Sequence, residues 1–137
     1  MDLEPRTTHE LVTGWWLYFR LQSGTRDNRK RLEGGEPLAA QAGADGVRSR
    51  IEAGGTAAID LILALLEAAS GDGDMALVAS GPLEDLLALH AAALAPDLVE
   101  AIRRSPILAR AMRSVWTDAD DFDAATASAL RPWLNSR

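Results

Sequence analysis

The chain has 137 residues, of which 47% are hydrophobic and 25% are charged, and it contains no cysteine. This length predicts a single domain over residues 1–137, and the lack of cysteine excludes disulfide bonds and thiolate metal sites. The net charge of −6 is unevenly spread, because no lysine or arginine occurs between Arg50 and Arg103 while that window holds nine acids. Such a negative field repels nucleic acid and attracts basic protein surfaces, although a solvated face that keeps a protein dissolved has the same composition.

The first residues of the chain do not have the composition of a signal peptide. They carry three acids within "MDLEPRTTHEL" and no apolar core. The longest strongly apolar run, "AAIDLILALLEAA", is too short to cross a bilayer and contains Asp60 and Glu67. We therefore expect a cytoplasmic protein that does not bind membranes.

The first helix is expected to begin near Thr7. Thr7 and Glu10 have the spacing of a capping box, in which each residue bonds the backbone N–H of the other. The apolar residues that follow recur at helical period and include Trp15 and Trp16. Aromatic side chains at this spacing usually fill a core, so we expect both tryptophans to be buried.

Residues 22–55 predict a long, partly irregular connection, because they contain seven of the eleven glycines. Short helical turns are expected only near 37–41 and 47–53. The segment Arg26–Arg31 is a basic cluster with no interleaved aromatic residue and no phosphate-loop spacing. A solvated connection is the favoured interpretation of that cluster, with binding of a phosphate or an acidic partner as the alternative.

From residue 56 onward the pattern is helical almost without interruption. The segment 56–70 is apolar on nearly every side, with Asp60 and Glu67 on one narrow polar stripe, which is typical of a central helix. "GDGDMALVAS" then predicts a turn, capped by Asp72 and Asp74, and a short helix.

The stretch "SGPLEDLLALH" predicts the start of another helix. Gly81 suits the N-cap, Pro82 the first helical position, and Glu84 the third, from which its carboxylate could bond back to the cap. His90 falls on the apolar stripe formed by the leucines, where a lone histidine is more often structural than catalytic. The side chains of Glu84 and Asp85 point about 100° apart on a helix, so they do not form a catalytic pair.

Three more helices are expected toward the C-terminus. Two should begin at Pro96 and Pro106, the second capped by Ser105, and the last should follow the acids of "DADDFD" and end near Pro132. No run of alternating, β-branched residues predicts a strand. The predicted fold is therefore all-α, with six to seven short helices packed as antiparallel pairs in an orthogonal bundle or a HEAT-like arrangement.

Neither a metal site nor a cofactor site is predicted, and no catalytic residue is assigned. The two histidines, His9 and His90, are far apart in sequence. "DADDFD" lacks the glycine and the final acid of a calcium loop, and it is better explained as an acidic helix N-terminus.

Part of the chain resembles a known family. The stretches "ALVASGPLEDLLALH" and "RRSPILARAMRSVW" are similar to those of an uncharacterised bacterial family of unknown function that has a Gly-Pro-Leu-Glu-Asp-Leu-Leu signature. The resemblance covers about residues 56–116. The positions that carry it are Gly81, Pro82, Leu83, Glu84, Asp85, Leu86, Leu87, Arg110, Val115 and Trp116. It implies a small helical bacterial domain and no particular activity.

The favoured function is that of an acidic module that binds a basic protein, such as an immunity protein or antitoxin-type inhibitor of a bacterial toxin. The expected partner-binding residues are the acids Asp60, Glu67, Asp72, Asp74, Glu84 and Asp85. One alternative is a small-ligand or enzymatic domain in which His90 and Glu84 act with an anion clamp formed by Arg26–Arg31 or by Arg110 and Arg113. A second alternative is an oligomerising structural module that forms a homodimer. Glu84 and Asp85 could instead pair with Arg110 or Arg113 inside the protein and specify the fold.

Overall fold

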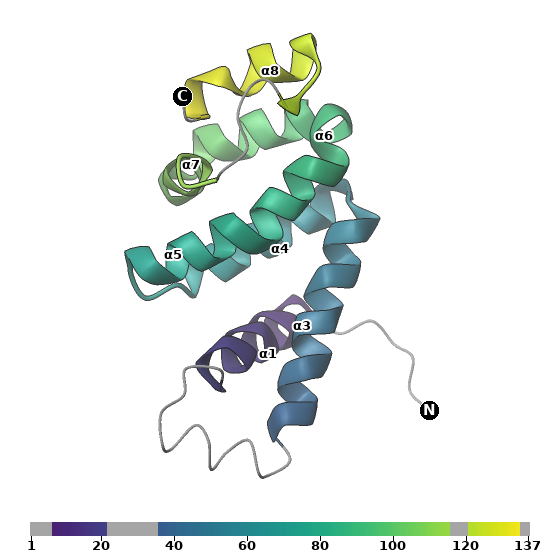
Figure 1. The fold of residues 1–137 in the computed structure, drawn as a ribbon, viewed down its shortest axis with the longest axis vertical. Coiled ribbons are helices and arrows are strands. Elements are labelled where there is room, and N and C mark those ends of the chain that lie inside the picture. The colour runs from purple at the N-terminus through teal and green to yellow at the C-terminus, as the bar shows by residue number, and fades with distance from the viewer. Residues whose placement is uncertain (1–6, 22–35, 116–120, 135–137) are drawn as a thin grey trace. The chain divides into compact units, whose positions relative to one another are not determined.

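The computed structural model describes residues 7–21, 36–115 and 121–134 (Figure 1). Within these ranges the regular structure is entirely helical and contains no strand, so the all-α prediction is confirmed. The chain divides into two compact units, residues 1–49 and 50–137, and each is described by itself. The predicted single domain over 1–137 is not tested by this division and stays a prediction.

The first unit contains α1 (Thr8–Leu21) and most of α3 (Glu36–Ala53). The predicted capping box is present: Glu10 N–H donates to Thr7 Oγ1 at 3.2 Å, and Thr7 N–H donates to Glu10 Oε1 at 3.4 Å. Trp15 and Trp16 are buried as predicted, and their rings meet edge to face with centroids 4.7 Å apart.

Over residues 36–53, helix α3 corrects the prediction of an irregular connection, since Glu36–Ala53 forms one continuous helix. Residues 22–35 of that predicted connection lie outside the described residues. The glycines that suggested a loop serve helix packing instead. A Cβ atom on Gly43 would lie 2.5 Å from the Cα of Gly14, and one on Gly46 would meet the side chain of Leu11. Glycine at these positions lets α1 and α3 approach more closely than any other residue would allow. The basic cluster Arg26–Arg31 lies outside the described residues.

The second unit begins with the end of α3 and a sharp break at two glycines. Gly54 and Gly55 have φ values of 74° and 73°, which a residue with a Cβ atom adopts only at a cost. Helix α4 (Gly55–Glu67) follows. It is the predicted central helix, since it buries Ala58, Ile59, Leu61, Ile62, Leu65 and Leu66.

The stretch around Pro82 does not begin a new helix, contrary to the prediction. Helix α5 (Asp72–Val78) continues through a π-helical turn, Ala79–Leu83, into α6 (Glu84–Arg104). Proline has no N–H and crowds the preceding turn, and the wider π-turn accommodates it. The N–H of Glu84 reaches the carbonyl of Ala79, five residues back, so Glu84 does not cap a helix start at Gly81.

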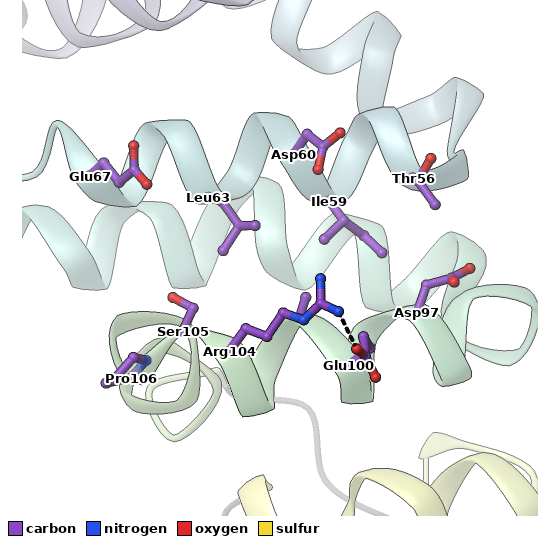
Figure 2. Close-up of a pocket in the computed structure, with 11 residues that line it drawn as sticks. Thr56, Ile59, Asp60, Leu63, Glu67, Asp97, Glu100, Arg104, Ser105 and Pro106 are labelled. Atoms are coloured by element: carbon purple, nitrogen blue, oxygen red, sulfur yellow. Dashed lines mark ion pairs between the residues drawn. The ribbon is translucent and has the colours of Figure 1, made fainter.

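Pro96 lies inside α6, so the prediction of a helix that begins there was wrong. Figure 1 shows that α6 changes direction along its length, and Figure 2 shows the segment from Asp97 to Arg104 facing α4. A proline within a helix is a common cause of such a bend. Pro96, which the sequence suggested as a helix boundary, therefore lies within a single bent helix.

The C-terminal part contains α7 (Pro106–Met112), α8 (Ala124–Leu130) and a 3₁₀ turn, Arg131–Trp133. The predicted cap of α7 is confirmed, because Leu108 N–H donates to Ser105 Oγ at 3.2 Å. Asp123 caps α8, and its carboxylate accepts the backbone N–H of Thr126 at 2.8 Å. That backbone hydrogen bond is the main reason why the pKa of Asp123 is lowered.

The core of this unit is formed by α6 together with α4, α7 and α8, all of which contact it. Four leucines of the predicted apolar stripe, Leu83, Leu86, Leu87 and Leu94, are buried as expected, whereas Leu89 of the same stretch is exposed. Along the part of the chain that the structure describes, no helix is both long enough and apolar enough to cross a membrane.

Candidate functional site: an acidic groove between α4 and α6

One face of α4 is not covered by the core and forms a wall of a groove. Its residues recur at i, i+3, i+4, i+7 and i+11, which places them on one side of the helix. They are Thr56, Ile59, Asp60, Leu63 and Glu67. The predicted acids Asp60 and Glu67 thus lie on the same wall, and both are exposed.

The opposite wall comes from the C-terminal part of α6 and the start of α7. Asp97, Glu100, Ala101 and Arg104 again follow helical spacing, and Ser105 and Pro106 complete this wall. This segment of α6 follows Pro96 and faces α4 (Figure 2). We call the space between the two walls, lined by these eleven residues, the α4–α6 groove.

The groove is a hollow of about 480 Å³, a volume within the range of small-ligand sites and large enough for side chains of a partner. Its apolar lining includes Ile59, which is buried, and Leu63 and Ala101, which are half-buried. The rim carries four carboxylates, on Asp60, Glu67, Asp97 and Glu100, and one cation, on Arg104. The lining therefore has a formal charge of −3 over an apolar floor.

Only one of these four carboxylates has a cationic partner within the described parts of the chain. Arg104 Nη2 lies 2.7 Å from Glu100 Oε1, one turn earlier in the same helix. Asp60, Glu67 and Asp97 form no ion pair with any described residue. The four acids are exposed and carry the same negative charge, and the groove between them has an apolar lining. The groove therefore favours a cation that brings its own apolar surface.

The other acids predicted to bind a partner lie elsewhere. Asp72 pairs with Arg110, with Nη2 and Oδ1 3.3 Å apart, and Asp74 accepts the backbone N–H of Ser70 at 2.9 Å. Glu84 and Asp85 stand at the start of α6, where they form no ion pair with the described residues. The expected pairing of these two acids with Arg110 or Arg113 is therefore not observed among the described residues.

His90 makes a structural contact. Its Nε2 atom lies 2.8 Å from the carbonyl oxygen of Glu52, near the end of α3. A carbonyl oxygen only accepts, so we assign the proton of this bond to Nε2. The imidazole also lies against Gly54, where a Cβ atom would come within 3.0 Å of the ring.

The residues of the suggested anion clamp are engaged separately. His90 bonds Glu52, Arg110 bonds Asp72, and Glu84 is six residues from His90 on α6, which places the two on different sides of the helix. Arg113 follows α7 as its C-cap residue. The structure thus gives His90 and Arg110 separate structural contacts, with Glu52 and Asp72.

The described residues contain no group of three or more histidine, cysteine, aspartate or glutamate side chains placed to hold a metal ion. Within "DADDFD", Asp118 and Asp120 lie outside the described residues, and Asp123 is occupied as the cap of α8.

Asp97 and Glu100 are the acids of the groove that the sequence analysis did not single out. Both were visible as acids in the cation-free window, and with Ala101 and Arg104 they form a stripe at helical period. The missing information was that this stripe faces the one on α4. The bend of α6 decides that, and a sequence pattern does not show it.

Residues 41–126 match the family of unknown function DUF6869. Because this match spans more than half of the chain, the protein belongs to that family. The sequence resemblance to an uncharacterised family of unknown function, over about residues 56–116, is thus confirmed at the level of such a family. No curated protein and no solved structure matches the chain.

Proposed function

We propose that this protein is an acidic helical module that binds a basic protein through the α4–α6 groove. The observation that carries the proposal is the combination of four rim carboxylates with an apolar floor in one hollow. A basic segment with an aliphatic surface would satisfy both features, because its cations meet the rim while its apolar atoms cover Ile59 and Leu63. Electrostatic attraction of this kind mainly raises the association rate and the specificity.

The partner class that fits best is a basic bacterial toxin, which the protein would hold inactive as an immunity protein or antitoxin does. Support for this role comes from the small size of the chain and from the negative window without lysine or arginine. Nucleic acid is an unsuitable partner, because its phosphates would meet the same negative field.

The binding proposal predicts that removing groove carboxylates weakens the affinity for a basic segment. The probe is a short synthetic helical peptide that carries arginine and leucine side chains, measured by fluorescence anisotropy. We expect Asp60→Asn and Asp97→Asn to lower its affinity by about two- to five-fold each, the range of a partly exposed charge pair. The affinity should also fall as salt rises from about 50 to about 300 mM, because salt screens exposed charges.

Asp85→Asn is the matched control, because it removes the same charge from an exposed position that does not line the groove. The proposal fails if Asp85→Asn weakens binding as much as the groove variants, or if the peptide does not bind the wild-type protein. For the inhibitor role, coexpression of the protein with a basic toxin encoded by an adjacent gene should restore growth, and Asp60→Asn combined with Asp97→Asn should weaken that rescue.

A further inference from the structure

Arg104 is the one basic residue in the lining of the α4–α6 groove. Its side chain extends from the last turn of α6 toward α4, and its guanidinium pairs with Glu100 at 2.7 Å (Figure 2). The aliphatic stem of an arginine commonly lies along apolar surface while its charged end stays in water. Arg104 thus places on the groove the same chemistry that a basic partner would bring.

The ion pair between Arg104 and Glu100 is weak enough for another cation to displace Arg104. The side chains are 78% and 59% exposed, so water screens their attraction. Both residues also belong to one helix, and a pair four residues apart on a helix surface contributes little to stability. The guanidinium of a partner could therefore take the place of Arg104 at Glu100 at small cost.

The charge balance of the groove favours such an exchange. Arg104 neutralises at most one of four carboxylates, and Asp60, Glu67 and Asp97 form no ion pair within the described residues. An incoming arginine would meet these carboxylates, but it would also be repelled by Arg104 as long as that side chain stays in the groove.

We propose that Arg104 is an internal competitor of the partner: in the free protein it occupies the position that an arginine side chain of the basic partner takes in the complex. This inference rests on the proposed function, because it assumes that the groove is the binding site. It names the chemistry recognised there as a guanidinium on an aliphatic stem. Arg104 would lower the affinity for weakly basic segments and so restrict binding to strongly basic ones.

The test compares Arg104→Gln with Arg103→Gln. Arg103 is the matched control, because it is also exposed in the last turn of α6 and changes the net charge equally, but it does not line the groove. The probe is the arginine–leucine helical peptide. The control peptide has the same sequence with citrulline in place of arginine. Citrulline preserves the shape of the side chain and removes its charge. Thermal melting checks that all variants are folded at the assay temperature.

We expect Arg104→Gln to bind the arginine peptide about two- to five-fold more tightly than the wild type, the effect of releasing one exposed pair. Arg103→Gln should change the affinity by less than about 1.5-fold, because exposed charges outside the groove are screened. The citrulline peptide should lose the difference between the wild type and Arg104→Gln. In the wild type, the Nε–Hε NMR signal of Arg104 should shift when the arginine peptide binds.

Two further results would overturn the inference, and they separate it from the proposed function. If the arginine peptide binds in the groove but Arg104→Gln binds it equally or more weakly, Arg104 is not a competitor and the groove remains the binding site. If Asp60→Asn and Asp97→Asn leave the affinity unchanged, the groove is not the binding site, and both proposals fall.

Discussion

At the residue scale, His90 illustrates how a suggestive side chain acquires a structural role. It lies on the apolar stripe of α6, and its ring lies against Gly54. Gly54 directly follows the end of α3 and has a positive φ. The Nε2 atom satisfies the carbonyl of Glu52, which a helix end would otherwise expose. The histidine thereby ties the middle of α6 to the break before α4.

Substitutions at this contact should be coupled. Gly54→Ala should destabilise the protein by about 1–3 kcal/mol, because it combines an unfavourable φ with a Cβ atom 3.0 Å from the His90 ring. In a His90→Ala background the steric part disappears and the φ cost remains. Urea denaturation of the two single variants and the double variant measures the coupling. Strictly additive losses would show that the ring does not restrict residue 54.

At the scale of elements, whether a glycine or proline lies inside a helix or at its end depends on the tertiary contacts around it. Gly43 and Gly46 lie within α3, at its contact with α1, although glycine density usually indicates a loop. Pro82 lies in a π-turn and Pro96 in a bend, although both resemble helix starts. In contrast, Pro106 does stand at the first position of α7 behind its Ser105 cap.

The helical glycines should respond differently to alanine. Gly43→Ala should destabilise the protein most, by about 1–3 kcal/mol, because its Cβ would collide with the backbone of Gly14. Gly46→Ala should cost less, since it meets the end of the flexible Leu11 side chain. Gly73→Ala, with nothing within 4 Å, should stabilise α5 by about 0.5–1 kcal/mol. Thermal denaturation ranks the three, and equal effects would contradict the close packing of α1 and α3.

At the scale of the whole molecule, the core around α6 and the groove both belong to residues 50–137. The helices that surround α6 are within this range, and so are the residues that line the groove. The contact between His90 and Glu52 also lies within it. This unit therefore contains the interactions that a cooperative fold requires, as well as the candidate site.

Residues 50–137 are accordingly expected to fold without the rest of the chain. The fragment should show a helical circular dichroism spectrum and a single cooperative thermal transition, and it should bind the arginine–leucine peptide as the full chain does. A fragment over residues 56–137 lacks Ile51, the Glu52 carbonyl and Gly54, so it should melt at a lower temperature. A non-cooperative transition for 50–137 would show that its core depends on residues 1–49.

The candidate site could be predicted only in part. The sequence indicated that Asp60 and Glu67 share a polar stripe on a helix that is otherwise buried, and this is observed. It did not indicate that Asp97 and Glu100 face them. The six predicted acids divide in the structure, and Asp72, Asp74, Glu84 and Asp85 lie outside the groove, because proximity along the chain does not determine which helix faces meet.

The sequence by itself determined the helical class, the capping of α1 and α7, and the inward leucines of α6. These features depend on local hydrogen bonds and on the helical period, both of which are written in neighbouring residues. Only the tertiary structure decided that Gly43 and Gly46 pack against α1, that Pro96 lies at a bend, and that two acidic stripes form a groove. Each of these depends on contacts between residues far apart in the chain. In such contacts, the space beside one helix limits the size of the side chains on the helix that packs against it.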